Sequence, residues 1–262
     1  MADYIDVEKA RGLPGLRLVV PPVPGPWAEG AKGLFHVKGI PVIRVRQTPG
    51  EPNPELSAWT GESNAPQAIL DDEPARTSWT EMILLAERLS PDPPLLPNDP
   101  EQRALLFGLG HLLCGEEGFG WQRRLMMFHQ VIPLPESVLP ADHPGRLLVQ
   151  SMAGRYGYSA EIAEAAPRKA AEVLGAFASR LEAERTRGNR YLLGASLTAL
   201  DIYWATFAAL VRPLPPELCE FPPVMRGQYE LRDATVLEAA APILLEHRDF
   251  VYENHLELPV DL

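Results

Sequence analysis

The chain is poor in cysteine. Only Cys114 and Cys219 occur among its 262 residues, far apart and outside any Cys-x-x-Cys pair. Two isolated thiols exclude a disulfide scaffold and a structural zinc site, and they are typical of a reducing compartment, so we expect a cytoplasmic protein. His247 and His255 near the C-terminal end have no neighbours at metal-ligand spacing, and we expect no metal site.

Long apolar runs and an excess of basic residues are also absent. No stretch approaches about 18 consecutive apolar residues, so we expect no membrane span. Residues 1–12 are charged and have no apolar core, which argues against a secretory signal. Lysine and arginine number 24 against 35 acidic residues, a net charge of −11, which argues against nucleic acid or an anionic membrane as a partner.

The N-terminal part contains a short α/β pattern. Residues 1–15 are a polar extension, and residues 16–20 have the β-branched content and the length of a strand. After the rigid loop PPVPGPW, residues 28–38 are expected to form a helix that ends at Gly39, and residues 42–46 a second strand. Strand, helix and strand in this order predict a right-handed parallel crossover.

The central stretch, residues 63–89, contains a proline directly before a predicted strand. Pro66 precedes the apolar residues 67–70, and a turn or further strand follows them. Proline cannot donate to a sheet ladder, so this position indicates an edge or a special turn. Thr77 or Ser78 then begins a helix, and a capped helix start presents N–H groups that can hold a carboxylate.

The rest of the chain is predicted to be helical and to follow a proline-rich linker at residues 91–98. A chain of 262 residues can hold one large or two modest domains, and the linker divides it. Residues 131–144 and 212–226 are proline-rich connections without predicted regular structure. Helices are expected over residues 99–115, 119–131, 143–156, 166–187, 199–211 and 233–248.

A capping box is predicted at the start of the fifth of these helices. Thr198 and Asp201 have the required spacing, with the acid three residues after the cap and able to reach back to its N–H group. We expect this pair to be structural and to fix a core helix of the helical part.

Together these features resemble the glutathione transferase superfamily, in its cytosolic and bacterial-like form. The resemblance rests on the Ala65-Pro66 pair before a strand, the KGIP motif before the second strand, the linker and the capping box. It covers most of residues 16–210. It implies an α/β thioredoxin-like domain at 16–90 and an all-helical domain at 99–262.

The resemblance also implies a ligand and the residues that hold it. Pro66 is expected to be a cis-proline, and the backbone of Ala65 to pair with the cysteine of glutathione as cosubstrate. Thr77 and Ser78 take the positions that hold the γ-glutamyl carboxylate. A homodimer and a small-molecule second substrate are the partners that the family implies.

The usual catalytic side chain of this family is missing. Such proteins stabilise the glutathione thiolate with a Tyr, Ser or Cys near the start of the first helix, yet residues 16–47 contain no Ser, Thr, Tyr or Cys. Catalysis is expected to use the backbone of Gly25 and Ala28 with the helix dipole, the indole N–H of Trp27, or a donor from elsewhere such as Tyr4 or a residue of the helical part. The alternative role for the Trp27 side chain is packing in the core or between the domains.

Residues 119–131 are expected to line the pocket of the second substrate. Arg123 or Arg124 would hold an acidic substrate and Phe128 would form an apolar wall, although aromatic residues at such positions are often simply core. The function predicted is therefore a glutathione transferase acting on an apolar or acidic electrophile by conjugation, displacement, lyase or isomerase chemistry. The alternative is a non-catalytic relative that binds ligands or serves as an assembly module.

Overall fold

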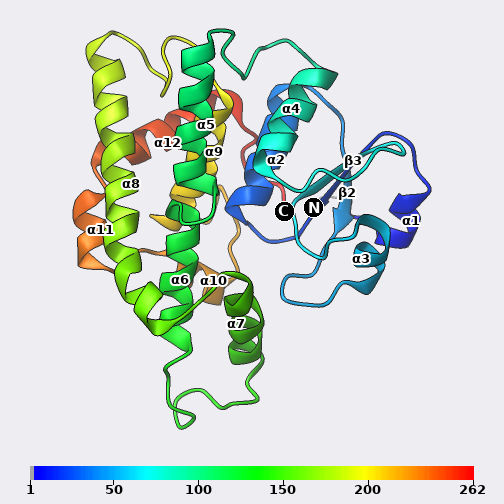
Figure 1. Ribbon diagram of the computed structural model, residues 1–262, viewed down its shortest axis with the longest axis vertical. Coiled ribbons are helices and arrows are strands. Elements are labelled where there is room, and N and C mark those ends of the chain that lie inside the picture. Colours follow the sequence, from blue (N-terminus) through cyan, green and yellow to red (C-terminus); the bar gives the residue numbers. More distant parts are fainter. Residues whose placement is uncertain (1–2) are drawn as a thin grey trace.

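The computed structural model describes residues 3–262 and shows an α/β domain beside a larger helical domain (Figure 1). Strand β1 (Leu16–Val20) is the centre of a mixed sheet with the order β2-β1-β3. It pairs in parallel with β2 (Ile43–Arg46) and antiparallel with β3 (Gln67–Leu70). The predicted fold class, a thioredoxin-like domain followed by an all-helical domain, is confirmed.

Side chains alternate between the two faces of this sheet, as the pleat of a strand requires. Leu18 and Val20 point to the face covered by helices α2 (Pro26–Val37) and α4 (Trp79–Leu89) and join the main core. Val19 points the other way, into a smaller cluster below helix α3 (Pro54–Thr60). The sheet is thus covered on both faces, which explains why every residue of β1 is buried.

The N-terminal residues differ from the polar extension that their composition suggests. They contain a short helix, α1 (Val7–Arg11), whose Ala10 is buried in the smaller cluster. Ile5 forms a parallel bridge with Val45 at the edge of β2. The sequence did not predict this packing because Ile5 and Ala10 stand among charged residues. Val45 of β2, with which Ile5 pairs, lies about forty positions away in the sequence.

The possible further strand after β3 is reduced to one bridge. Ala68 and Arg76 exchange two main-chain hydrogen bonds, of 2.9 and 2.8 Å. Asp71 adopts a left-handed conformation with φ of 45° at the turn between them. The chain therefore returns along β3 only briefly before α4 begins.

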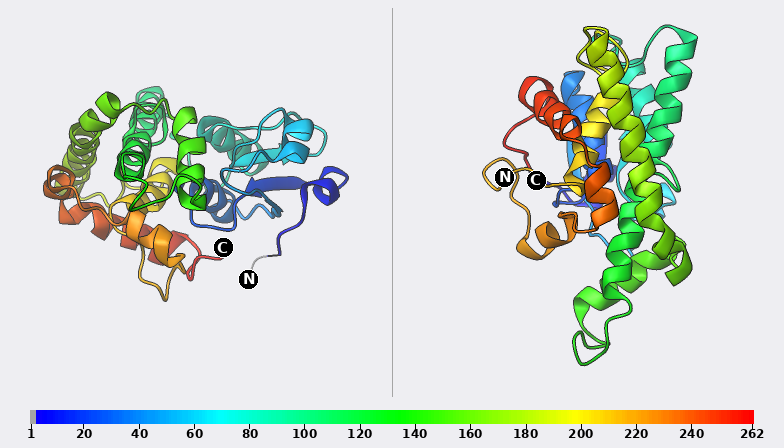
Figure 2. Two further views of the ribbon diagram at one scale, coloured as in Figure 1. Left: turned by 90° about the horizontal axis from the view of Figure 1, so that it is seen from below. Right: turned by 90° about the vertical axis from the view of Figure 1, so that its left-hand side faces the viewer.

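The helical domain is built around α9 (Ala199–Phe207), all of whose residues are buried. In Figures 1 and 2, α5 and α6 run one after the other beside the long α8, and α9 lies among them. No helix in residues 3–262 has the length and apolar character needed to cross a bilayer. The remaining elements are α5 (Pro100–Cys114), α6 (Phe119–Val131), α7 (Pro144–Arg155), α8 (Ala160–Thr186), the 3-10 helix η1 (Ala208–Leu210), α10 (Pro223–Tyr229), α11 (Ala234–Ala239) and α12 (Pro242–His255).

Three helix boundaries differ from expectation because of proline. Helix α8 begins at Ala160, after the N-cap Ser159, and contains Pro167, whereas the predicted helix began at residue 166. The single helix expected over 233–248 is two, α11 and α12, since the residue before Pro242 disfavours helical backbone. Helix α10 begins within the segment 212–226, which was predicted to be irregular, and extends beyond it, with Pro223 at its first turn.

The predicted capping box at the start of α9 is confirmed. One oxygen of Asp201 accepts the main-chain N–H of Thr198 at 2.8 Å and its hydroxyl at 2.7 Å. The other accepts the N–H of Leu192 at 2.8 Å and lies 2.9 Å from Nε2 of His247 on α12. Asp201 is fully buried, so one carboxylate joins the preceding loop, the helix start and α12.

Candidate functional site

The loop before β3 has the geometry that the resemblance implies. The Ala65–Pro66 peptide bond is cis, as expected for that position. Buried Gln67 holds the loop from within, because its side-chain amide donates to the carbonyl groups of Asn64 and Glu62. Ala65 is half-buried, and its N–H and C=O groups make no hydrogen bond with another described residue. Its main chain is therefore available to a ligand.

The N-cap of helix α4 is Ser78, one of the two predicted starts, and the cap is a complete capping box. The Ser78 hydroxyl accepts the N–H of Glu81 at 3.2 Å, and the Glu81 carboxylate accepts the N–H of Ser78 at 3.0 Å. The sequence contained the information for Glu81, since Ser78-x-x-Glu81 has the spacing of a capping box. The role of Glu81 was not predicted because the family resemblance concerned only Thr77 and Ser78.

The donors at this helix start hold a carboxylate of the chain itself. Oε2 of Glu81 receives the N–H of Thr77 at 3.1 Å, the N–H of Ser78 and the Ser78 hydroxyl at 2.8 Å. Partial burial raises the pKa of Glu81, but the hydrogen bonds from Ser78 and Thr77 outweigh it, and the pKa lies below its ordinary value. The same donors therefore fit a ligand carboxylate, provided that Glu81 turns away.

The start of α2 offers main-chain donors and no hydroxyl. Gly25 is the N-cap and makes no side-chain bond, while Pro26 occupies the first position and has no N–H group. The N–H groups of Trp27 and Ala28 belong to the first turn, which has no intrahelical acceptors. These groups and the positive end of the helix can hold an anion such as a thiolate.

The indole of Trp27 is engaged in the contact between the domains. Its Nε1 donates to the main-chain oxygen of Cys114, at the end of α5, at 2.9 Å. Its ring meets that of Phe207 on α9 edge to face, with centroids 4.8 Å apart. A role for this N–H at a thiol would require the bond to Cys114 to break.

Tyr4 reaches the loop after β1 from the N-terminal segment. Its hydroxyl donates to the carbonyl of Pro21 at 3.3 Å, and burial, with Glu29 as the next cause, raises the pKa of the phenol. The hydroxyl therefore braces the loop leading to α2.

The two predicted arginines of α6 have different surroundings. Arg123 is 1% exposed, and its guanidinium donates to the carbonyl groups of Leu210 and Tyr229 at 2.8 and 3.3 Å. It joins α6 to η1 and α10 and does not face a cleft. Arg124 is half-buried and donates to the hydroxyl of Tyr229 at 3.0 Å.

Aromatic side chains surround the exposed side of α6. Phe128 is buried and meets Tyr156, at the end of α7, with ring centroids 5.4 Å apart. Trp121 lies 4.4 Å from the same tyrosine ring and donates its indole N–H to the Tyr156 carbonyl. Tyr229 was missed from sequence because it lies on a helix, α10, that the sequence did not predict.

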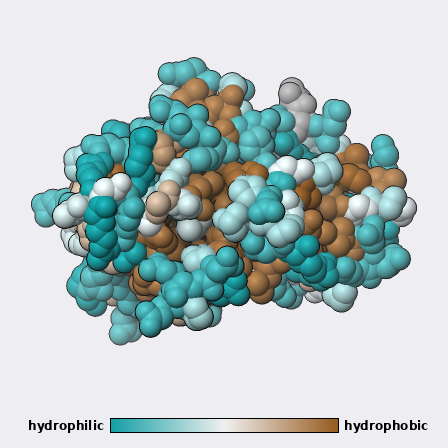
Figure 3. All heavy atoms as spheres, turned by 90° about the horizontal axis from the view of Figure 1, so that it is seen from above, coloured by the Kyte–Doolittle hydropathy of each residue, from teal (hydrophilic) through white to brown (hydrophobic). Residues whose placement is uncertain are grey.

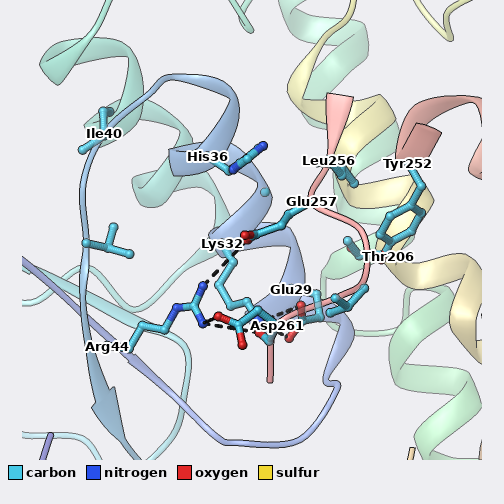
Figure 4. Close-up of a pocket in the computed structure, with 13 residues that line it drawn as sticks. Glu29, Lys32, His36, Ile40, Arg44, Thr206, Tyr252, Leu256, Glu257 and Asp261 are labelled. Atoms are coloured by element: carbon cyan, nitrogen blue, oxygen red, sulfur yellow. Dashed lines mark hydrogen bonds and ion pairs between the residues drawn. The ribbon is translucent and has the colours of Figure 1, made fainter. Parts of the chain in front are cut away.

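A separate pocket lies between α2, β2 and the C-terminal segment (Figure 4). It encloses about 140 Å³ and is lined by none of the predicted site residues. Arg44 pairs with Asp261 at 2.8 Å and Lys32 with Glu29 at 2.9 Å. Burial raises the pKa of Glu29 although Lys32 lowers it. Arg44, and Lys32 through its bond of 2.7 Å to the Asp261 carbonyl, hold the C-terminal segment against the first domain. The described residues contain no cluster of three or more potential metal ligands.

Comparisons with known proteins identify the fold. No family model and no curated protein matches the chain. A glutathione S-transferase from Methylobacterium radiotolerans, solved with glutathione sulfonate, is 19% identical, with 91% of both chains covered and a TM-score of 0.64. The beta-etherase LigF from Sphingobium is 18% identical, covering 90% of this chain and 99% of that one, with a TM-score of 0.57.

A third solved structure is similar over the same length. It is a glutathione transferase family member from Pseudomonas fluorescens with two glutathione molecules bound, 15% identical, with 92% and 97% of the chains covered and a TM-score of 0.55. The chain therefore has the glutathione transferase fold.

Proposed function

We propose that the first domain binds glutathione between the Ala65–Pro66 loop and the start of α4. The observation that carries the proposal is the carboxylate already held there by Thr77 and Ser78, beside the unengaged main chain of Ala65. A γ-glutamyl carboxylate would replace that of Glu81, and the cysteine backbone would pair with Ala65. Two of the similar solved structures contain glutathione or its sulfonate, which supports this ligand.

The proposed chemistry is attack by the glutathione thiolate on an electrophile in the interdomain cleft. The first-turn N–H groups of α2, from Gly25 to Ala28, would stabilise the thiolate. Its sulfur forms a bond to an electrophilic carbon. Either a leaving group departs with its electron pair, or the π electrons of an activated double bond move onto the activating group and the adduct takes up a proton. The second substrate is an apolar or acidic electrophile beside α6.

A non-catalytic binding module is the second candidate. It is favoured by the engagement of the Trp27 indole with Cys114 and by the absence of a hydroxyl at the start of α2. Such a protein would bind glutathione without lowering the pKa of its thiol. The two candidates therefore differ in the state of the bound sulfur.

We further propose that two copies associate, as the resemblance implies. Large apolar side chains are exposed on neighbouring parts of the two domains, Leu84 on α4 and Leu112 on α5, at 52% and 43%. The surface seen from above is hydrophilic with several apolar areas (Figure 3). Analytical ultracentrifugation is expected to give a dimer mass, whereas a monomer at all concentrations would exclude the proposal.

Calorimetric titration with glutathione tests the main proposal. We expect saturable binding of glutathione and much weaker binding of cysteinylglycine, which lacks the γ-glutamyl carboxylate. Equal binding of both, or of neither, would show that Thr77 and Ser78 do not hold the ligand. Ultraviolet titration of the bound thiol then separates the candidates, because only the enzyme is expected to ionise it at a lower pH than free glutathione.

A further inference from the structure

Helix α6 carries two successive arginines that have no acidic partner. Neither Arg123 nor Arg124 forms an ion pair with a carboxylate in residues 3–262, although the chain has more acidic than basic residues. Asp233 is the acid that acts on Arg123 electrostatically, and its side chain is already occupied by the N–H of Val236. This part of the molecule therefore holds excess positive charge.

The positive charge of these guanidinium groups carries a desolvation free-energy cost because they are partly removed from water. Burial, with the neighbouring charge of Arg124 as the next cause, lowers the pKa of Arg123 to about 10. Burial would also lower the pKa of Arg124, but Tyr229 and Tyr156 raise it, so its guanidinium stays charged. An anion arriving from solvent at Arg124 would offset this cost.

The guanidinium of Arg124 has donors to spare. It donates to the Tyr229 hydroxyl at 3.0 Å and, weakly, to the sulfur of Met127 at 3.7 Å. Its Nε atom is buried and has no hydrogen-bond partner among the described residues. A guanidinium offers five N–H groups in a planar fork that matches a carboxylate with two parallel bonds.

Aromatic rings from three separate elements frame this group. The carbon at the centre of the guanidinium lies 5.9 Å from the ring centre of Trp27 and 5.4 Å from that of Tyr229. Tyr156, at the end of α7, is close enough to raise the pKa of the guanidinium. Trp27 and Tyr156 are partly exposed, as Arg124 is, so a ligand can reach all three side chains.

We propose that Arg124 binds the carboxylate of a small planar acid, aromatic or conjugated, whose flat body lies against Trp27 and Tyr156. This rests on the proposed function and specifies its second substrate as an organic carboxylate. Trp27 belongs to the first turn of α2, so the body of the acid lies next to the N–H groups assigned to the glutathione thiolate. The site thus selects electrophiles by their negative charge.

Calorimetry with trans-cinnamate and with cinnamyl alcohol tests the proposal, because the two probes share a skeleton and differ in charge. We expect the wild-type protein to bind cinnamate at least tenfold more tightly than the alcohol. Arg124→Gln should lose this preference and bind both alike, while Arg124→Lys keeps part of it. Arg168→Gln, which removes an exposed guanidinium paired with Glu172 on α8, should change nothing.

The comparison of the two probes with the wild-type protein needs no variant, so it decides the matter even if Arg124→Gln fails to fold. Absence of a carboxylate preference in the wild type would overturn the inference. An Arg124→Gln variant that is folded and keeps the preference would also overturn it, as would one that alters only the ionisation of bound glutathione. Failure of glutathione to bind, with cinnamate binding intact, would instead refute the proposed function and leave the carboxylate site standing.

Discussion

The start of α4 shows how one side chain can occupy a site that is proposed for a ligand. Glu81 stabilises the helix by accepting three hydrogen bonds, and each of its donors is one that the proposed glutathione site uses. Binding at the proposed site would therefore break part of the capping box. The affinity that results is the difference between two carboxylates competing for the same N–H groups.

Substitution of Ser78 and Glu81 should move glutathione affinity in opposite directions. Ser78→Ala removes a donor and is expected to weaken binding by about 1.5–3 kcal/mol, the range for a hydrogen bond to a charged group. Glu81→Gln replaces the competing carboxylate by a weaker acceptor and should tighten binding. Isothermal titration measures both, and an unchanged affinity in a folded Ser78→Ala variant would place the ligand carboxylate elsewhere.

The Glu81 carboxylate should also affect how the free energy of unfolding depends on pH. The pKa of Glu81 is lowered in the folded state, so its stabilising effect is present above the ordinary glutamate pKa of 4.5 and is lost as the pH falls through the folded value. Glu81→Gln should flatten this acid limb of the stability curve, measured by urea unfolding across the range. An acid limb identical to that of the wild type would contradict the assigned hydrogen bonds.

Substitution of Trp27 tests whether its indole N–H activates the thiol of bound glutathione. Trp27→Phe keeps a ring at the interface and removes the N–H that donates to Cys114. We expect a loss of about 0.5–1.5 kcal/mol of stability, the usual net value of a hydrogen bond, with the thiol pKa of bound glutathione little changed. A bound thiol that returns to its free pKa in this variant would instead make the indole the activating group.

At the scale of elements, α9 depends on Asp201 at its start more than α5 depends on Asp99. Asp201 serves the loop before the helix, the cap itself and His247, and it is fully buried. Asp99 at the start of α5 makes a single comparable bond, to the N–H of Gln102, at an exposed position. The two acids have similar local roles but very different tertiary ones.

Asp201→Ala should therefore destabilise the protein far more than Asp99→Ala. The first leaves several buried donors without an acceptor and is expected to cost about 3 kcal/mol or more. The second removes an exposed cap and should cost about 0.5–2 kcal/mol. Chemical denaturation compares them, and equal losses would mean that the network around Asp201 adds nothing to the cap.

At the scale of the whole molecule, the two domains are joined along α2 and α9. Gly30 on α2 lies so close to Tyr203 on α9 that a Cβ atom would come within 2.5 Å of the ring. Thr206 on α9 also donates to the Pro26 carbonyl at 3.1 Å. The close approach of these helices holds Trp27 and Arg124 in their relative positions, although they belong to different domains.

Gly30→Ala should accordingly separate the helices and destabilise the fold by about 1–3 kcal/mol, as overpacking does. Gly175→Ala is the matched control, because that helical glycine in α8 has open space around its Cβ position. It should stabilise by about 0.5–1 kcal/mol through the helix preference of alanine. Thermal unfolding of both variants checks the prediction, and a stabilised Gly30→Ala would show that the interface is loosely packed.

The sequence by itself determined the features that depend on near neighbours along the chain. The strands, the helix start at Ser78 and the Thr198–Asp201 box follow from spacing over a few residues, because a cap or a strand is defined within its own segment. The resemblance built on them gave the fold, and the structure confirms it. The predicted binding of glutathione by Ala65 and Ser78 remains a prediction.

Tertiary structure alone decided which side chains meet. Trp27 gives its N–H to Cys114, 87 positions away, and Arg124 lies among rings from α2, α7 and α10. Arg123 has the same charge and the next position in sequence, yet it is spent on main-chain carbonyl groups. Successive residues of a helix point about 100° apart, so packing against distant elements turned one arginine into the core and left its neighbour half-buried among aromatic rings.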